Sequence, residues 1–534
     1  MNEAWFKEEA GTTEADASTK NMASFNHLPD MIIEEGTGGK SAKPFLARAR
    51  LDSNPRNPPK SDGPWGGCDR IATPLGRHPL VKIFDDVCQD GSQKTLRQKL
   101  IAIIWNDQPS GILAVRAGFA LQDTENFPTI VLALQYGAVA TDRAVAIVTE
   151  AANHVFQFKE LHDLSIEVIE ADFSLHTSED VDFSQRFRPI PLPGIGLGRA
   201  DRLICGGTLG CYLQLHLEPK PEARKTGLES KIVYLALTCH HVLSEQTTPQ
   251  FKLLKIKQEA GALRATEQKC IEMMEEMDRI NEERYHKVCQ FDCGFGKVLA
   301  TSGYDKCVFL DGEEEKAALD RMISDWGLVQ IHQSRLDSAD ALPSSSLSLE
   351  QLIVYKSLGR FLVPSSAENP DFPNNGICSI DDLLATLGDE DDPKRIIFKH
   401  GNASGARRGA ISDLRATIFM RHTADGQPCI LAGQAVLAVV PPKDQKYYVG
   451  RSNDFGRKGD SGSIVHAYDG SALGIYFGGQ SEQHYDPRNP KVSSLDGLHF
   501  VQAMSDALPE MHDVLGPVYP DFDVKIVQCW DMDD

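Results

Sequence analysis

The sequence lacks the segments that would direct a protein into or across a membrane. Its first residues show no basic stretch followed by an apolar one, which a secretory signal requires. No apolar run approaches the roughly 20 residues that a helix needs to cross a bilayer. These absences predict a cytoplasmic or nuclear protein that has no membrane as a partner.

Positive charge is also scarce. The 534 residues include 76 Asp and Glu against 55 Lys and Arg, a formal net charge of −21 at pH 7. A surface this acidic repels phosphate backbones and anionic lipids. Nucleic acid is therefore not expected as a partner.

The cysteines show no regular spacing that would indicate disulfides or a metal site. The 12 cysteines are scattered, and Cys289 and Cys293 are the only close pair. No neighbouring Cys or His completes the ligand spacing of a zinc site around that pair. The cysteines therefore predict reduced thiols and no metal.

The chain is long enough for two or three folded units, so a multi-domain protein is expected. Residues 1–76 are rich in Glu, Asp, Ser, Gly, Asn and Pro, and predict a disordered tail. Residues 77–182 predict a small α/β (α+β) domain, whose role the sequence does not indicate. Its expected order is a helix over 96–105, strands over 112–115 and 129–134, a helix from Thr141, and a strand over 165–170.

Residues 190–510 contain many short apolar runs separated by turns, which is typical of an all-β domain. Two insertions interrupt it, at about 252–290 and 335–393, and residues 511–534 are expected to be a C-terminal tail. The first insertion predicts an amphipathic helix over about 255–289, with a stripe rich in Met. Two roles fit this stripe, packing against the protein's own strands and binding a protein partner; the N-terminal domain is a second candidate for partner binding.

Three short motifs point to one chemistry. Ser461 lies in a Gly-Asp-Ser-Gly turn, His241 ends a Thr-x-x-His motif after an apolar run, and Asp325 begins an Asp-Trp-Gly-Leu strand start. A Ser hydroxyl is a weak nucleophile that needs a base within hydrogen-bond reach, and the base needs a group that orients it. The order His, Asp, Ser along the chain is that of chymotrypsin, whereas subtilisin and the α/β-hydrolases have other orders.

These motifs resemble those of the chymotrypsin/HtrA-type serine peptidases of the PA clan, and most closely the large intracellular trypsin-like proteins of fungi. The resemblance covers residues 190–510. It implies an all-β double β-barrel peptidase domain with a helical insertion. The implied function is an intracellular serine endopeptidase that hydrolyses protein or peptide substrates through an acyl-enzyme, without a cofactor.

The resemblance also assigns roles to residues. Ser461 is the expected nucleophile, His241 the base and then the acid, and Asp325 the carboxylate that holds the imidazole. The backbone amides of Gly459 and Ser461 are the expected oxyanion hole. Asp292 stays open as an alternative to Asp325, because it also precedes a run of small and aromatic strand residues.

A substrate pocket is implied beside Ser461. Phe455 lies six residues before Ser461, where trypsin-like enzymes set their primary specificity, and an aromatic residue there argues against an acidic pocket for Lys or Arg. Phe477, Gly478 and Gly479 lie in a run that resembles the substrate-binding strand. Together they predict a preference for small or apolar side chains.

The sequence departs from the secreted members of this family. Val242 stands where those enzymes commonly have a disulfide cysteine, and Cys239 beside the expected base is read as either a redox-sensitive thiol or a small buried apolar residue. No activation site precedes the domain, so Asp460 needs a partner other than a freed N-terminus, or the oxyanion hole forms only on an allosteric event. These departures support a second hypothesis, a catalytically silent or latent peptidase fold that acts as a binding or regulatory protein.

Overall fold

The structure is a computed structural model, and it describes fifteen stretches of the chain. These are residues 31–35, 45–51, 70–88, 92–118, 126–175, 193–198, 206–243, 295–302, 307–308, 321–336, 376–389, 392–424, 427–439, 455–480 and 495–528. The expected helix over 255–289 and the alternative carboxylate Asp292 lie outside them.

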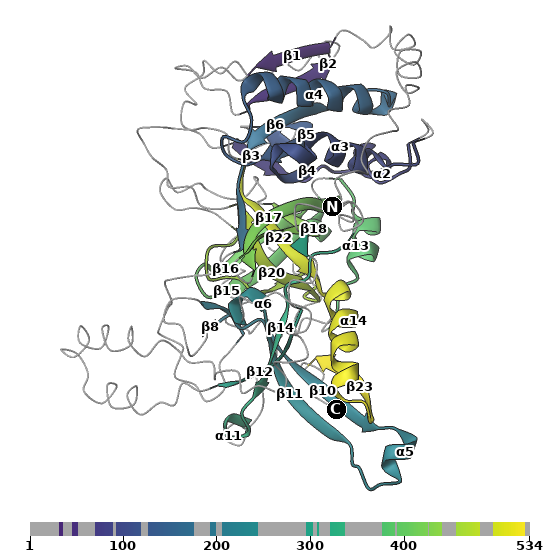
Figure 1. The fold of residues 1–534 in the computed structure, drawn as a ribbon, viewed down its shortest axis with the longest axis vertical. Coiled ribbons are helices and arrows are strands. Elements are labelled where there is room, and N and C mark those ends of the chain that lie inside the picture. The colour runs from purple at the N-terminus through teal and green to yellow at the C-terminus, as the bar shows by residue number, and fades with distance from the viewer. Residues whose placement is uncertain are drawn as a thin grey trace, which may run out of the picture.

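The described part of the chain is mostly β-sheet (Figure 1). Its strands form a sixteen-stranded sheet, a five-stranded sheet and a two-stranded sheet. The α/β domain lies at one end of the molecule and the five-stranded sheet at the other, with the remaining strands of the large sheet between them.

Six strands of the large sheet pair antiparallel in a closed ring. In ring order they are β15 (Ile396–Gly401), β16 (Gly405–Ile411), β18 (Gln427–Val439), β22 (Leu498–Ala503), β20 (Ala472–Gln480) and β19 (Ile464–His466), and β19 pairs again with β15. Residues 396–411 form the hairpin β15–β16. Closure pairs each ring strand on both sides over part of its length, and the end of β20 at Gly478–Gln480 extends beyond its pairing with β19.

The α/β domain has the predicted order of elements. Its elements are α3 (Leu96–Ile104), β4 (Pro109–Gly118), β5 (Phe127–Leu134), α4 (Thr141–Val155) and β6 (Ser165–Glu170). Ile112 and Ala114 pack with the helices, whereas Leu113 and Val115 pack into a second core on the other face of the sheet. Both faces are buried, which explains why these strands read as continuous apolar runs.

The expectation of a disordered tail over residues 1–76 differs from the structure in three places. The strands β1 (Met31–Glu35), β2 (Ala47–Leu51) and β3 (Arg70–Thr73) join the large sheet. In β2 the side chains of Ala47, Ala49 and Leu51 are fully buried, while Arg48 between them forms an ion pair with the buried Glu167. Small buried residues that alternate with arginines look polar in composition, which hides the strand.

The sheet and its core continue across the expected boundary between the two domains. Strand β4 pairs with β17 (Ala416–Ala424), with Ile112 opposite Thr417. Leu113, Val115 and Val131 belong to the same buried cluster as Leu209 and Phe477. The α/β domain is therefore built onto the rest of the molecule by both hydrogen bonds and apolar packing.

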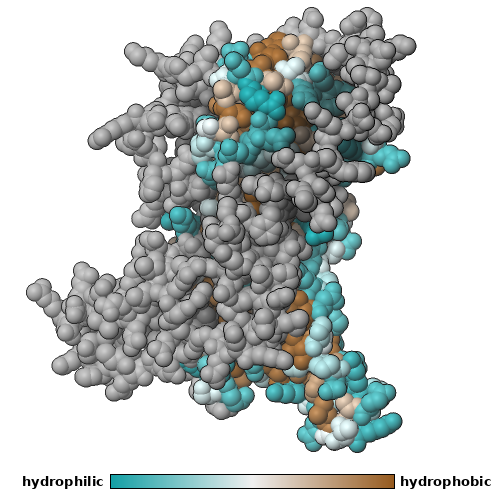
Figure 2. All heavy atoms as spheres, viewed as in Figure 1, coloured by the Kyte–Doolittle hydropathy of each residue, from teal (hydrophilic) through white to brown (hydrophobic). Residues whose placement is uncertain are grey.

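The five-stranded sheet combines strands of the expected peptidase domain with one strand from the expected C-terminal tail. Its strands, in spatial order, are β12 (Gly296–Thr301), β14 (Gly327–Ile331), β11 (Lys231–Thr238), β10 (Cys211–Pro219) and β23 (Phe522–Gln528). Within the described residues this sheet is open, so the expected second barrel is not seen as a closed ring. Hydrophobic and hydrophilic residues are interspersed on the surface of this end of the molecule (Figure 2).

Strand β23 corrects the expected C-terminal tail at 511–534. It pairs with β10 from Gln528 opposite Leu213 to Phe522 opposite Pro219. Phe522, Val524 and Ile526 pack against the core, because alternate residues of a strand face the same side. The helix α14 (Met504–Leu515) follows β22 and leads into this strand.

The remaining elements are short. They are α2 (Leu80–Ile83), β7 (Phe173–Leu175), β8 (Gly196–Gly198), β9 (Gly206–Thr208), α5 (Pro221–Arg224), α6 (His240–Leu243), β13 (Cys307–Val308), α11 (Gln333–Leu336), α13 (Ile380–Thr386), β21 (Leu495–Asp496) and four single 3₁₀ turns at 105–107, 159–161, 393–395 and 516–518. Helix α13 lies in the second expected insertion. Among the helices that the structure describes, none has the length and apolar composition that crossing a bilayer requires.

Candidate active site

Two neighbouring strands bring the expected base and carboxylate together. Thr238 at the end of β11 lies opposite Gly327 at the start of β14. His241 follows β11 in the single turn α6, and Asp325 lies two residues before the start of β14. Because the strands are antiparallel, the C-terminal end of β11 and the N-terminal end of β14 lie side by side at the same end of the sheet.

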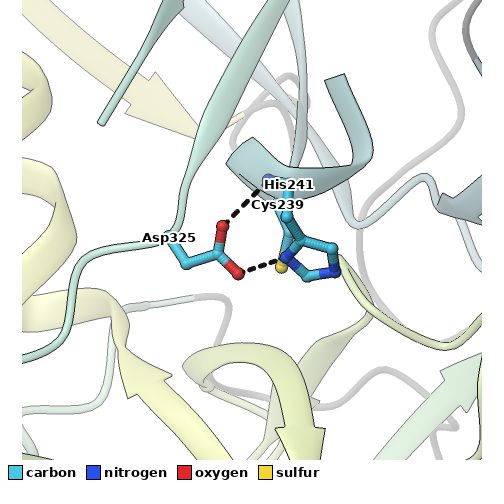
Figure 3. A group of neighbouring side chains, drawn as sticks. All are labelled: Cys239, His241 and Asp325. Atoms are coloured by element: carbon cyan, nitrogen blue, oxygen red, sulfur yellow. Dashed lines mark hydrogen bonds and ion pairs between the residues drawn. The ribbon is translucent and has the colours of Figure 1, made fainter. Parts of the chain in front are cut away.

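Asp325 binds His241 through both carboxylate oxygens (Figure 3). The backbone N–H of His241 donates to Oδ1 at 3.0 Å, and Nδ1 lies 2.5 Å from Oδ2. Burial alone would raise the pKa of Asp325, but the charge and hydrogen bonds of His241 hold this pKa below its usual range. An ionised carboxylate on Nδ1 leaves the other ring nitrogen, Nε2, as the one that can accept a proton.

Asp325 is also held in place through its backbone N–H and through the residue that follows it. Its backbone N–H donates to the side-chain oxygen of Gln502 at 2.9 Å. The next residue, Trp326, is fully buried, and its indole N–H donates to Glu510 of α14 at 3.1 Å. The aromatic residue of the Asp-Trp-Gly-Leu motif therefore anchors the carboxylate to the helix.

Cys239 adds a thiol to this group, and Figure 3 shows it beside His241 and Asp325. Ligand atoms of the three residues lie within 4.8 Å of one another, which makes them the one candidate metal-binding group among the described residues. Burial, with the negative charge of Asp325, raises the pKa of the Cys239 thiol well above its usual range. A metal would have to ionise this thiol and displace the proton on Nδ1, so the chemistry of the group favours the His–Asp hydrogen bond. The neutral, fully buried thiol also favours the packing role of Cys239 over redox sensitivity.

The Ser461 turn packs directly against the His241 segment. Gly462 has φ of +97°, and a Cβ there would overlap the backbone oxygen of Thr208 and the hydroxyl of Thr238. A Cβ on Gly207 would meet both Val242 and the backbone oxygen of Ser461. Glycine is required at these positions because the backbones of the two segments are in contact.

The Ser461 hydroxyl does not bond to the expected base in this structure. It donates to the backbone oxygen of Phe477 at 2.9 Å. The Nε2 atom of His241 is buried and has no hydrogen-bond partner within the described stretches. The expected base and the expected nucleophile therefore lie on segments that pack together, without a hydrogen bond between them; catalytic hydrogen bonds of free enzymes are often unmade before substrate binds.

The amides expected to form the oxyanion hole are available. Among the described residues, no group accepts a hydrogen bond from the backbone N–H of Gly459 or of Ser461. Gly459 has φ of +98°, a conformation that a side chain would strain, and its carbonyl oxygen is taken by the hydroxyl of Thr208 at 2.8 Å. The two free donors flank Asp460, whose position therefore decides how they point.

Asp460 has a buried partner in Lys399 on β15. The Nζ atom of Lys399 lies 2.7 Å from Oδ2, and both side chains are completely buried. Oδ1 accepts from the backbone N–H groups of Ala403 and Ser404 at 2.9 and 3.0 Å, and Oδ2 accepts from that of Arg457 at 2.9 Å. Burial would raise the pKa of Asp460, but the Lys399 charge and these hydrogen bonds hold the pKa below its usual range. An internal ammonium thus occupies the place for which the sequence indicated no partner.

The expected pocket residues lie beside Ser461 but inside the core. Phe455 and Phe477 are fully buried; Phe455 packs edge-on against Tyr476, and Phe477 stacks on Phe500. Gly478 and Gly479 continue β20 next to Phe477. Their role in side-chain preference stays a prediction.

Two residues of this site were missed by the sequence analysis. Lys399 lies in the hairpin β15–β16, and nothing in the local sequence indicates that it reaches Asp460. Thr208 links three segments, because its N–H donates to Ser461, its hydroxyl to Gly459, and its carbonyl accepts from Thr238. The Gly-Gly-Thr sequence before β10 was the available signal, since two glycines there allow the close approach.

Comparison with known proteins gives little direct help. No family model matches the chain, and no curated protein matches it. Three solved structures resemble it weakly: a glutamic acid specific serine protease (11% identity, TM-score 0.27, covering 60% of this chain and 97% of that one), Thermobifida fusca Protease A (12%, 0.25, 63% and 98%) and Nocardiopsis protease (11%, 0.24, 63% and 98%). Likeness at this level assigns neither a fold nor an activity, so the function has to be judged from the chain's own geometry.

Proposed function

We propose that this protein is a serine endopeptidase with Ser461, His241 and Asp325 as its catalytic residues. The observation that carries the proposal is the buried bond between Asp325 and Nδ1 of His241, with Nε2 left open beside the Ser461 turn. An ionised carboxylate is expensive to bury, and here it fixes the tautomer that a general base requires.

The proposed reaction proceeds by acyl transfer. Ser461 Oγ attacks the scissile carbonyl carbon while Nε2 of His241 takes its proton, and Asp325 stabilises the imidazolium. The amides of Gly459 and Ser461 donate to the oxyanion, and the leaving amine departs with the proton from His241. Water, deprotonated by His241, then hydrolyses the ester and restores Ser461.

Several features support the resemblance to chymotrypsin-type folds. The six-stranded ring carries the Ser461 turn between β18 and β19, and the five-stranded sheet carries His241 and Asp325. The described cysteines Cys88, Cys211, Cys239 and Cys378 are free thiols, which suits an intracellular enzyme. Protein or peptide substrates with small or apolar side chains are the proposed class.

One observation favours the second hypothesis, a latent or silent peptidase fold. The Ser461 hydroxyl bonds to Phe477 rather than to His241. For acyl transfer this hydroxyl would have to leave Phe477 and turn toward Nε2. A protein in which this change never occurs would bind peptides without cleaving them.

Labelling of the purified full chain with a fluorophosphonate distinguishes the two. A small probe of this class phosphonylates a serine only where a base and an oxyanion hole are assembled. Wild type is expected to label stoichiometrically, and both Ser461→Ala and His241→Ala are expected to lose labelling. Asp325→Asn should label at least about 10³-fold more slowly, because the wrong tautomer of His241 is favoured.

Ser463→Ala is a matched control, because it removes a neighbouring hydroxyl that bonds only within the turn. Labelling that persists in Ser461→Ala would exclude Ser461 as the nucleophile. An unlabelled wild type with native stability would support the silent protein. Cleavage of peptides, and not of esters alone, then identifies an endopeptidase.

A further inference from the structure

The edge of β20 beside Ser461 is already occupied by another part of the chain. Strand β7 (Phe173–Leu175) pairs antiparallel with it, with Leu175 opposite Gly478, Ser174 opposite Gly479 and Phe173 opposite Gln480. On the other edge of β20, Gly478 and Gly479 pair with Phe500 and His499 of β22. Strand β7 therefore takes the one remaining edge of these residues.

The covered segment of β20 begins next to the residue that binds the Ser461 hydroxyl. The carbonyl that accepts the Ser461 hydroxyl belongs to Phe477, the residue immediately before the segment that β7 covers. An extended peptide that pairs with residues 478–480 is thereby directed at Ser461, with its backbone held by main-chain hydrogen bonds. A strand edge pairs with one partner at a time, so β7 and such a peptide exclude each other.

The contact between β7 and β20 is close. A Cβ on Gly478 would overlap the backbone oxygen of Ser174, so glycine at this position permits the pairing. The ring of Phe173 is buried edge-on against Phe500, with the centroids 4.8 Å apart, in the same core as Phe477.

A short connection joins β7 to the α/β domain and keeps it close to β20. Strand β6 ends at Glu170 and β7 begins at Phe173. The backbone N–H of Ala171, between them, donates to Leu134 of β5 at 2.8 Å. A segment tethered this closely has an effective concentration on the order of millimolar or more, which a free peptide has to exceed.

We infer that Phe173–Leu175 is an intramolecular competitor of extended peptides for the β20 edge, and that the site accepts such peptides only when β7 leaves it. As a statement about cleavage this rests on the proposed function. The competition itself is a binding equilibrium and needs no catalysis. The α/β domain, whose role the sequence did not indicate, thereby regulates access to Ser461.

Proline variants of β7 test the inference. Alternate residues of an antiparallel strand point their N–H groups at the partner, so one of Ser174→Pro and Leu175→Pro removes a hydrogen bond to β20. Ser174→Ala is the matched control, because it keeps the N–H and removes a hydroxyl that bonds to none of the residues the structure describes. The probe is a fluorescein-labelled peptide with the sequence of residues 170–175, and its binding to each full-length protein is measured by anisotropy.

At least one proline variant is expected to bind this peptide about tenfold or more tightly than wild type and Ser174→Ala. Equal binding by all four folded proteins would overturn the inference. Fluorophosphonate labelling of the same samples reports on Ser461 separately, because the small probe does not need the β20 edge. Tighter peptide binding without labelling would support the competition and refute the peptidase; labelling without any difference in peptide binding would do the reverse.

Hydrogen exchange of wild type decides the matter if neither proline variant folds. Millimolar peptide is expected to speed the amide exchange of residues 173–175 at least about threefold, because the peptide displaces them from β20. Unchanged exchange at saturating peptide would contradict the competition.

Discussion

The Lys399 ammonium and the Asp460 carboxylate form a completely buried ion pair, and Asp460 directly precedes Ser461 in the sequence. Such a pair is costly to bury, and its value lies in what it holds in place. Through Asp460 it joins β15, the turn after β15 and the segment before Ser461. The pair therefore sets the conformation of the Gly459 and Ser461 amides without any cleavage of the chain.

Replacing Lys399 tests this role. Lys399→Met is expected to lower the free energy of unfolding by about 3–5 kcal/mol, since it leaves a buried carboxylate unpaired. It should also abolish fluorophosphonate labelling, because Asp460 no longer holds the turn. Urea unfolding and the labelling rate measure the two effects.

The double variant Lys399→Met/Asp460→Asn separates stability from positioning. Removing both charges is expected to restore much of the stability while labelling stays low. A double variant that labels at the wild-type rate would show that the ion pair has no part in organising the site.

His466 makes stability depend on pH. It is buried on β19, its Nδ1–H donates to the carbonyl of Gly470, and burial lowers its pKa from 6.5 to about 4. Between these two values the unfolded chain binds a proton that the native protein does not. The free energy of unfolding should therefore fall by about 3 kcal/mol as pH drops from about 6.5 to about 4.

Urea midpoints of wild type and His466→Gln at pH 7, 5.5 and 4.5 check this expectation. The variant should lose most of the slope in this range. The carboxylates of Asp325 and Asp460, whose pKa values are lowered, lose their contribution only as pH falls below about 4. An unchanged slope in the variant would assign the effect to other groups.

At the scale of elements, the sequence predicted the strands and helices that local patterns determine. Strands β4, β5 and β6 read as apolar runs because both of their faces are buried, and α3 begins at a capping Thr95. Strands β2 and β23 were missed, since Ala and Arg alternate in one and Asp, Lys and Gln interrupt the other. Both depend on partners far away in the sequence, β6 and β10.

The residues of the candidate site also fall into two groups, those that local motifs predict and those that only the three-dimensional packing reveals. His241, Asp325 and Ser461 lie in motifs of a few residues, because each side chain needs a particular turn to present it. The bond from Lys399 to Asp460 and the pairing of β7 with β20 join segments with no shared pattern. Only the three-dimensional packing reveals them.

At the scale of the whole molecule, the α/β domain cannot be removed without damage. Leu113, Val115, Val131 and Ile169 belong to the core that also contains Phe477. Each such side chain contributes about 1.5–3 kcal/mol by its burial, and a typical protein has about 5–15 kcal/mol in total. The loss would also expose the edge of β17 that β4 covers.

A fragment of residues 190–534 is therefore expected to aggregate or to lack cooperative thermal unfolding. Circular dichroism on heating, with gel filtration, measures both. Co-expression with residues 1–182 as a separate chain is the control and should restore a folded complex. A soluble fragment that unfolds cooperatively on its own would mean that the two parts are independent domains.

The pairing of β10 with β23 also has a consequence for the order of events on the ribosome. Lys220 and Pro520, which lie near the two facing ends of these strands and are hydrogen-bonded, are 300 residues apart. At about 5–20 residues per second, roughly 15–60 s of translation separate them. Throughout that time the sheet that bears His241 lacks its edge strand, and for most of it Ser461 has not yet been synthesised. The proposed function therefore implies that a nascent chain cannot cleave its neighbours on a polysome until Ser461 has been synthesised.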